Sequence, residues 1–386
     1  MIRILHSVSN MDRAGVETMI MNFYRRFDRE RIQFDFLQNK KKPGDYDEEI
    51  RSLGGRIFVS PGYMSYKKYM GYMTEIFKTY PEYKILHAQN GPLMVYALRA
   101  AQINNIPVRI AHSHSTSIPH DFKFGLKLCV KPMVKRLATD YWGCSNAAGE
   151  FLFTKKCWDR GNELIHNAIE VNRFEFNESP RQRIREQYGF GDKLVVGNVC
   201  RLEWQKNHKK LIEIFNVLHR LEPASQLVII GTGSFEEKLK KQVAELGLSD
   251  AVTFTGLQNN VYEWFSAFDV FVLSSFFEGL PVVGIEAQAA DLGCVFTDTI
   301  TSEVKITDDV RFMGLKDGAE AWARAILSAR KHDRGSRYND LKKAGYDIET
   351  ESKRLERLYL DMYERAAGAK RIHVSDGNGS EESVLV

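Results

Sequence analysis

Two glutamates beside a predicted helix start are the strongest candidates for chemistry in this chain. Residues 268–290 read FDVFVLSSFFEGLPVVGIEAQAA, in which Glu278 and Glu286 flank a proline that suits the first helical position. The amides of Val282 and Val283 then lack helical partners and favour phosphate oxygens. Carboxylates accept hydrogen bonds from hydroxyls, so the pattern fits a ligand with both phosphates and sugar hydroxyls. On spacing alone, an ordinary strand-to-helix turn with one capping and one solvated glutamate fits equally well.

Two cations follow another predicted strand, at residues 193–199. Arg201 and Lys206 lie in the loop CRLEWQKN that leaves this strand. An arginine can bind a diphosphate through two parallel hydrogen bonds, and a lysine beside it acts as a point charge. Solvated basic residues are the alternative, but the position at a strand end favours a binding role.

Glycines open two further loops. Gly231 and Gly233 precede a predicted helix at residues 235–246, but Glu236 stands where a dinucleotide fingerprint has its third glycine. Gly15 lies in the loop ahead of another predicted helix. Glycine lets a ligand approach the backbone, although a plain strand-to-helix turn accounts for either loop.

Histidines end the predicted strand at residues 108–112. His112 and His114 lie at the sheet edge where α/β proteins bind ligands. A histidine there can contact a reacting sugar or merely cap the strand. We expect one of the two to be functional.

Apolar runs alternate with helical patterns along the chain, which predicts parallel α/β sheets. Strands are expected near residues 2–6, 32–37, 56–59, 84–87, 108–112, 141–145, 193–199, 226–230, 252–254 and 270–273. At 386 residues the chain is long for one core, so we expect two domains. We place them at residues 1–178 and 179–350, followed by a helix at 351–366 and a disordered tail at 367–386.

The composition describes an ordinary globular protein with 44% hydrophobic and 27% charged residues. The net charge of +4 argues against duplex nucleic acid as a partner. The five cysteines form no CxxC pair, which indicates neither a zinc site nor a disulfide framework and favours a reducing cytosol. No apolar run approaches the ~20 residues of a membrane span, so we expect a soluble or peripheral protein.

A lysine stripe lies in the predicted helix at residues 122–137. Lys123, Lys127, Lys131 and Lys135 recur every four residues and would share one helix face. The stripe is either the solvated face of a core helix or a surface that meets anionic lipid or a lipid-phosphate acceptor.

Taken in order, the motifs resemble the retaining glycosyltransferases of family 4, which have the GT-B fold. The resemblance is greatest to bacterial exopolysaccharide and capsule enzymes. It covers residues 1–365 and rests on AGVE (14–17), HSHS (112–115), GNVCRLEWQKN (197–207), IIGTGS (229–234), TGLQNNV (255–261) and EGLPVVGIEA (278–287). Each motif alone is weak, whereas the ordered set is specific. It implies two Rossmann-like domains whose parallel sheets face a central cleft, with acceptor binding in the first domain and nucleotide-sugar binding in the second.

The resemblance also implies roles for the residues above. Glu286 would hold the nucleotide ribose, Glu278 a donor-sugar hydroxyl, and His114 would lie near the donor sugar. Arg201 and Lys206 would neutralise the departing diphosphate. The implied catalytic set is His114, Arg201, Lys206 and Glu278; the implied donor-binding set is Gly15, Gly231, Gly233, Leu257, Gly279, Leu280, Val282, Val283 and Glu286; the implied acceptor side is His112, Lys123, Lys127 and Lys131.

The implied reaction is metal-independent, retaining transfer of a hexose from a nucleotide-diphosphate sugar, with UDP favoured. The acceptor would be a saccharide or lipid-linked saccharide of surface polysaccharide biosynthesis, in the cytoplasm or at the inner face of the membrane. The departing phosphate would take the acceptor proton while the enzyme stabilises negative charge, and closure of the domains would exclude water. No metal or other cofactor is expected. Asp45 and Asp47 match the DxD of metal-dependent transferases, but they lie in a polar loop and we interpret the match as chance.

Two alternatives remain open at this point. A nucleotide-sugar 2-epimerase of the same fold would bind the donor without an acceptor surface, and a non-catalytic subunit would bind it without reaction. One departure from the family concerns the turn at residues 290–294, ADLGC, where relatives have a small-residue turn with Gly-Leu-Pro. We expect this turn to alter local packing more than chemistry and to lower stability.

Overall fold

The computed structural model describes residues 1–118, 121–331, 333–368, 371–375 and 381–385. The chain divides into two compact units: unit 1 comprises residues 1–167 and 349–386, and unit 2 comprises residues 168–348. Unit 2 begins before the boundary predicted at residue 178. The chain therefore enters unit 2 once and returns to unit 1 through its last helix.

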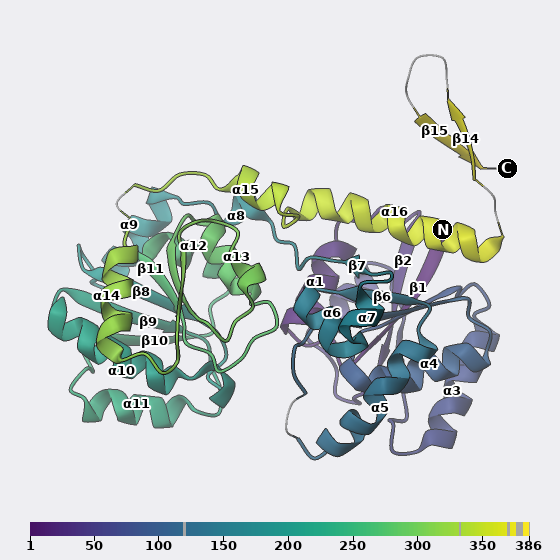
Figure 1. Cartoon of the computed structure of the whole chain (residues 1–386), viewed down its shortest axis with the longest axis horizontal. Helices are drawn as coiled ribbons and strands as arrows, with labels where there is room; N and C mark the ends of the chain where they lie inside the picture. The colour runs from purple at the N-terminus through teal and green to yellow at the C-terminus, as the bar shows by residue number, and fades with distance from the viewer. Residues whose placement is uncertain (119–120, 332, 369–370, 376–380, 386) are drawn as a thin grey trace. The chain divides into compact units, whose positions relative to one another are not determined.

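Unit 1 is built on a seven-stranded sheet in the order β3-β2-β1-β4-β5-β6-β7, with all of its strands parallel (Figure 1). This order reverses at β1, as in a doubly wound fold. The elements are β1 (Ile2–Val8), α1 (Gly15–Tyr24), β2 (Ile32–Gln38), α2 (Asp47–Ser52), β3 (Ile57–Val59), α3 (Tyr66–Thr79), β4 (Ile85–Ala88), η1 (Gly91–Met94), α4 (Val95–Ile103), β5 (Val108–Ser113), α5 (Phe124–Leu137), β6 (Asp140–Gly143), α6 (Asn146–Phe153), α7 (Lys155–Trp158), β7 (Glu163–Leu164) and α16 (Ile348–Ala367).

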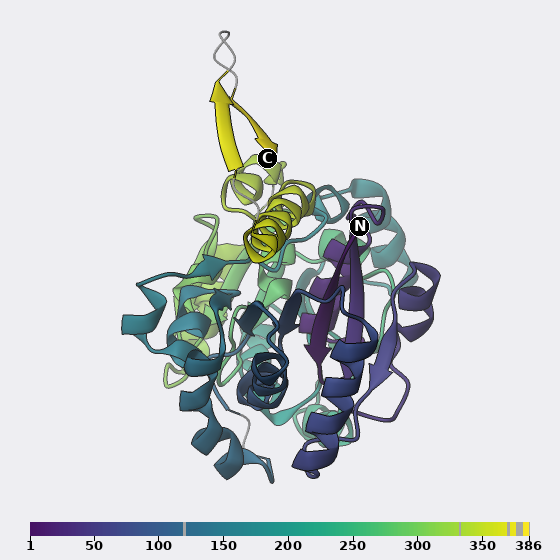
Figure 2. The ribbon, with the colours of Figure 1, turned by 90° about the vertical axis from the view of Figure 1, so that its right-hand side faces the viewer.

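The strands of unit 1 are covered on both faces because their side chains alternate between two apolar layers. On one face, Leu5 and Leu86 pack with apolar residues of α3, α4 and α5. On the other, Phe34 packs against Tyr24 of α1 and Tyr359 of α16, with ring centroids 5.1 and 5.8 Å away. Figures 1 and 2 show α16 running across the strands β1 and β2 rather than parallel to them. The last helix is thus a part of the core of unit 1.

Unit 2 repeats this arrangement with a six-stranded parallel sheet in the order β10-β9-β8-β11-β12-β13. Leu194, Val272 and Val295 pack against α10, α11 and α14 on one face of the sheet. The elements are α8 (Val171–Phe174), α9 (Glu178–Gln187), β8 (Leu194–Val199), η2 (Trp204–Lys206), α10 (His208–Leu221), β9 (Ser225–Ile230), α11 (Glu236–Glu245), β10 (Val252–Gly256), α12 (Val261–Ala267), β11 (Val270–Leu273), α13 (Val282–Ala289), β12 (Gly293–Thr297), η3 (Ser302–Val304), β13 (Val310–Met313), α14 (Ala319–Ala329) and α15 (Tyr338–Lys343).

The α/β class and both parallel sheets were predicted and are confirmed. The predicted strands occur within a few residues of their expected bounds, whereas β12, β13 and α14 were not predicted. In the tail, which was expected to be disordered, the structure describes β14 (Arg371–Ser375) and β15 (Glu381–Leu385) as an antiparallel pair. Pro132 was expected inside a helix, and α5 does continue through it.

Candidate functional site

The candidate site of unit 2 lies where its strand order reverses. β8 is paired with β9 on one side and with β11 on the other, so loops leave this edge in opposite directions. Ligands of open α/β sheets bind at such a switch point, outside the carboxyl ends of the strands. The loop at residues 200–207 follows β8, and the loop at residues 274–281 follows β11.

An ion pair joins these two loops. Lys206 Nζ lies 2.5 Å from Glu278 Oε1, with exposed side-chain fractions of 16% and 9%. The Ser275 hydroxyl donates to the same carboxylate oxygen over 2.8 Å. The sequence predicted both charges at one site without predicting their contact. In this arrangement each charge stabilises the other away from bulk water, where an unpaired charge is costly.

Hydrogen bonds hold the two loops in register around this pair. Phe276 N donates to Gln205 O over 2.8 Å, and Gln205 Nε2 donates to Phe277 O over 2.9 Å. Asn207 adopts the left-handed conformation, with a φ of 52°, and its side chain donates to Ser274 O over 3.1 Å. Asparagine tolerates this conformation better than most residues. The loop of β8 is therefore fixed to the loop of β11 at several points.

Helix α13 begins directly after this pair and carries the second glutamate. Pro281 was predicted as the first helical residue, but it is the N-cap, with a φ of −72° and a ψ of 106°. With Pro281 as the N-cap, Val282 and Val283 form the first turn of the helix, and their amides lack helical partners, as predicted. Burial raises the pKa of Glu286 to about 7. No hydrogen bond or ion pair engages this carboxyl group within the described part of the chain.

The other predicted donor-side residues differ in exposure. Arg201 is exposed, and so is Leu257, with 78% of its surface accessible. Gly231 and Gly233 pack against the loop of β8: an added Cβ would lie 2.1 Å from Cys200 O or 2.4 Å from Leu202 O. These two glycines therefore permit close packing between neighbouring loops, a role that the sequence pattern did not indicate.

A buried polar cluster beneath the loop was missed from the sequence. Cys200 Sγ donates to Asn198 Oδ1 over 3.3 Å and contacts His208 Nε2 at 3.3 Å. Burial raises the pKa of the Cys200 thiol to about 12 and lowers the pKa of His208 to about 4. Both groups are therefore neutral near pH 7 and support the loop without adding charge to it.

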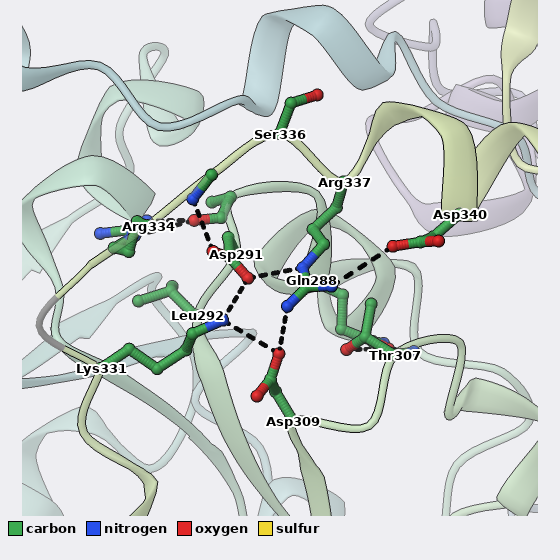
Figure 3. Close-up of polar contacts among 12 residues, drawn as sticks. Gln288, Asp291, Leu292, Thr307, Asp309, Lys331, Arg334, Ser336, Arg337 and Asp340 are labelled. Carbon is green, nitrogen blue, oxygen red and sulfur yellow. Dashed lines mark hydrogen bonds and ion pairs between the residues drawn. The ribbon is translucent and has the colours of Figure 1, made fainter.

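The C-terminal end of α13 is fixed by a polar network (Figure 3). Gln288 is fully buried; its amide donates to Gly284 O and Val304 O, and its Oε1 accepts from Ile306 N and Thr307 N. All of these bonds are between 2.8 and 2.9 Å long. The helix that begins at the candidate site is thus held by its neighbouring loop.

Asp291 occupies the turn that was predicted to depart from the family pattern. It has a φ of 52°, and its carboxylate lies 2.5 Å from Lys331 Nζ and 2.6 Å from Arg337 Nε. The Gly335 amide donates to it over 2.7 Å. Burial alone would raise the pKa of Asp291, but these donors lower it. The aspartate therefore ties this turn to residues 331–337, so the turn is supported by a network rather than left unsupported.

In unit 1, the predicted histidines lie at the end of β5. Their ring centroids are 3.9 Å apart. His112 is fully buried in the strand, whereas His114 follows its end and is partly buried. Position and exposure favour His114 over His112 as the histidine that a ligand can reach. Gly15 is exposed at the first position of α1, where an added Cβ would meet no atom within 4 Å.

These histidines belong to a larger neutral cluster that was not predicted. His112 Nδ1 lies 3.1 Å from His87 Nε2, and His87 Nδ1 lies 2.7 Å from the hydroxyl of Tyr359 in α16. Gln89 bridges the remaining members, His114 and His6, over 3.0 and 2.8 Å. The signal was present in the sequence, since a histidine stands near the carboxyl end of β1, β4 and β5.

Burial keeps this cluster uncharged. It lowers the pKa of His6 and of His114 to about 3, and it lowers the pKa of His87 and of His112 well below the ordinary range. The His6 Nε2, His112 Nε2 and His114 Nδ1 atoms are buried with no hydrogen-bond partner. His114 Nε2 is already bonded to Gln89, so a ligand hydroxyl could engage only Nδ1, and only after a movement that exposes this atom.

The predicted lysine stripe is not uniformly solvated. Lys127 Nζ pairs with Asp121 over 2.7 Å, and Lys131 Nζ lies 3.7 Å from the centroid of the Phe151 ring. Burial lowers the pKa of Lys131. Apolar side chains are exposed beside the stripe: Phe122 by 90%, Leu126 by 39%, Leu128 by 55% and Met133 by 46%. The surface of α5 is therefore mixed, with cations among exposed apolar side chains.

The DxD match has structural partners. Asp45 accepts a hydrogen bond from Arg13 N over 3.0 Å, and the buried Asp47 accepts one from Gln38 Nε2 over 2.6 Å. In the described ranges, no group of three or more His, Cys, Asp or Glu side chains is arranged to hold a metal ion. Helices in those ranges are all too short or too polar to cross a membrane.

Comparisons with known proteins agree with this geometry. Residues 180–348 match the family described as Glycosyl transferases group 1. The chain is 34% identical over 358 residues to EpsF of Bacillus subtilis (strain 168), a protein described as a glycosyltransferase; the match covers 90% of this chain and 93% of EpsF. It is also 23% identical over 384 residues to the capsular polysaccharide biosynthesis glycosyltransferase CapH of Staphylococcus aureus, covering 93% and 99% of the two chains.

A solved structure resembles the whole chain. HepE of Anabaena, crystallised in complex with UDP and glucose, has a TM-score of 0.73 and 16% sequence identity, and the match covers 94% of this chain and 100% of that one. At this identity the likeness shows the fold, which is the α/β GT-B fold predicted from the sequence.

Proposed function

This chain belongs to the group 1 glycosyl transferases, and on that premise we propose that it is a retaining, metal-independent enzyme of family 4. Its donor would be a UDP-sugar and its acceptor a saccharide or lipid-linked saccharide of surface polysaccharide biosynthesis. The observation that carries the proposal is the Lys206–Glu278 pair beside the start of α13, at the switch point of the sheet. HepE with bound UDP and CapH in capsular polysaccharide biosynthesis support the donor and the pathway class.

The chemistry follows from the charges at this point. The departing UDP carries negative charge on its diphosphate, and Arg201, Lys206 and the first-turn amides of α13 supply the opposite charge. Glu278 would accept from a hydroxyl of the donor sugar and keep Lys206 in place. Glu286 would accept from the ribose hydroxyls when it is ionised. The diphosphate itself would take the acceptor proton, so these residues need only bind, orient and stabilise.

A thermal-shift panel tests this proposal. UDP, GDP, ADP and their common sugars are compared with and without EDTA, because a ligand that binds only the folded protein raises the melting temperature. We expect UDP and UDP-sugars to raise it and EDTA to leave the shift unchanged. A shift that EDTA abolishes would contradict metal independence, and the absence of any nucleotide shift would contradict the donor site.

We propose further that the enzyme acts in the cytoplasm at the inner face of the membrane, with α5 in contact with anionic lipid. The support is the mixed surface in which Lys123 and Lys135 lie near exposed Phe122, Leu128 and Met133. Such a surface combines apolar insertion with charge attraction.

Sedimentation with phosphatidylglycerol vesicles should retain the protein, and phosphatidylcholine vesicles should retain less. The double variant Phe122→Ser and Leu128→Ser should lose binding while keeping its nucleotide shift; unchanged sedimentation would contradict the proposal.

A further inference from the structure

A cavity lies in unit 2, beside the candidate donor site. It has a volume of about 360 Å³ and is bordered by η2, α10 and α11, with Phe276 from the loop after β11. Small-molecule sites span roughly 300–1,000 Å³, so this cavity is large enough for a small ligand. Its lining does not include Arg201, Lys206, Glu278 or Glu286. The cavity is therefore distinct from the site proposed for the donor.

Aromatic side chains form its walls. Trp204 is 59% exposed, and its ring centroid lies 4.7 Å from that of Phe276 at an interplanar angle of 30°. Phe235 also lines the cavity, and the ammonium group of Lys238 lies 5.1 Å from the centroid of its ring. Aromatic faces carry partial negative charge and attract slightly positive C–H groups. The C–H groups on one face of a pyranose ring have this character because their carbons bear oxygen.

Acidic and basic side chains line the cavity around these aromatic rings. Glu245 and Lys209 are exposed, and Gln242 donates its amide to Lys209 O over 3.1 Å. The carboxylate of Glu203 accepts from the amide and the hydroxyl of Ser234 over 3.1 and 2.8 Å. Hydroxyl groups both donate and accept hydrogen bonds, so a lining that offers carboxylate acceptors and ammonium donors suits a polyol. The lining combines Glu203 and Glu245 with Lys209 and Lys238, so these side chains give it no net charge that would select an anion such as phosphate.

We propose that this cavity is a saccharide subsite, which takes one or two pyranose rings of a neutral oligosaccharide. The inference rests on the proposed function, because a transferase whose acceptor is a saccharide of a surface polysaccharide encounters such chains as acceptor or product. Trp204 and Phe276 belong to the two loops that carry Lys206 and Glu278, and Phe276 N donates to Gln205 O between them. A saccharide on these rings therefore contacts both loops of the donor site from outside it.

Tryptophan fluorescence provides a selective test. The chain has five tryptophans. Trp142, Trp158, Trp264 and Trp322 are at most 2% exposed, so quenching by acrylamide reports on Trp204. The full-length protein, saturated with UDP, is titrated with maltotriose, chitotriose and cellotriose. We expect at least one of these to lower the quenching constant about twofold.

Variants separate this subsite from the donor site. Phe235→Ala and, independently, Gln242→Ala should weaken the protection by at least about fivefold while the UDP melting shift stays unchanged. Lys240→Ala, on the same helix but outside the cavity lining, should behave as the unmodified protein.

If UDP still raises the melting temperature but no saccharide protects Trp204, the subsite is refuted and the proposed function stands. If a saccharide protects Trp204 only in a parallel titration without UDP, it occupies the donor site and the subsite is again refuted. If UDP causes no shift, the donor proposal fails.

Discussion

The two units have sheets whose strand order reverses in the same way, but the side chains at the carboxyl ends of their strands differ in charge. In unit 1, buried histidines lie near the carboxyl ends of β1, β4 and β5 and are kept neutral. In unit 2, the corresponding edge carries the Lys206–Glu278 ion pair. Neutral groups need only hydrogen bonds to be buried, whereas charges need a partner. We therefore expect unit 1 to be sensitive to acid and unit 2 to the loss of a single partner.

The largest effect is expected from breaking the ion pair at the candidate site. Lys206→Ala and Glu278→Ala should each lower transfer by about 10³-fold, because the charge that stabilises the leaving group is removed or misplaced. Transfer is measured with a radiolabelled UDP-sugar, and circular dichroism checks that the variants are folded. The double variant should lose little more than either single one, since coupled residues are not additive.

The matched control is Lys240→Ala, which removes an exposed lysine paired with Glu236 over 2.8 Å in the same unit. It should retain transfer. Near-normal turnover in Lys206→Ala or Glu278→Ala would overturn the assignment of the site.

The second effect concerns stability through Asp291. Asp291→Ala removes the more buried of the two carboxylates that Lys331 and Arg337 share, the other being that of Asp309, and should lower the free energy of unfolding by about 3 kcal/mol. Asp291→Asn should cost less, because asparagine tolerates the positive φ and still accepts hydrogen bonds. Urea unfolding measures both. Asp340→Ala, which removes an exposed partner of Arg337 at 3.4 Å, is the control and should change stability little. Equal losses in Asp291→Ala and Asp340→Ala would contradict the assigned network.

The third effect distinguishes the units by pH. Because burial lowers the pKa of the clustered histidines His6, His87, His112 and His114 in unit 1, the unfolded chain binds more protons than the folded one below about pH 6.5. The free energy of unfolding is therefore not reduced by these histidines above that pH. As the pH falls below it, the free energy of unfolding decreases by up to about 1.4 kcal/mol per pH unit for each histidine. Glu286 has the opposite sign, because its raised pKa adds stability that is lost as the pH rises from about 4.5 to 7.

Hydrogen exchange at pH 7 and pH 5 measures this difference. The sheet of unit 1 should lose amide protection at pH 5 before the sheet of unit 2, where His208 is the one histidine described here with a lowered pKa. His6→Phe, whose ring would lie among Phe34 and Phe36, should reduce the pH dependence of unit 1. Simultaneous loss in both units would contradict the contrast between them.

The smallest effect concerns the ionisation of Glu286. Since its pKa is raised to about 7, we expect affinity for UDP to increase severalfold between pH 6 and pH 8, as the carboxylate that accepts ribose hydroxyls forms. Calorimetric titration across this range measures the change. Glu286→Gln should bind with an affinity that is nearly independent of pH. An equal pH dependence in both proteins would assign the titration to another group.

Much of the fold could be predicted because buried parallel strands are apolar runs, as Val270–Leu273 illustrates. The edge strand β13 was missed because it is short and carries Arg311 in its middle. At the site, residue types and strand ends indicated Lys206 and Glu278, but a contact across 72 positions requires the fold. The histidine cluster could not be predicted from the sequence either, because its member His87 contacts Tyr359, which lies 272 positions further along the chain.

The boundaries of unit 2 have a consequence for how the chain can be divided. Ile169 N donates to Tyr346 O and Ile348 N donates to Ile169 O, over 2.9 and 3.0 Å, so the first and last residues of this unit lie side by side. A segment whose ends are adjacent is inserted into its host as a closed loop, and such segments tolerate excision and circular permutation. Residues 168–348, joined end to end by a short linker and reopened at an exposed loop, should therefore fold as an independent nucleotide-binding protein.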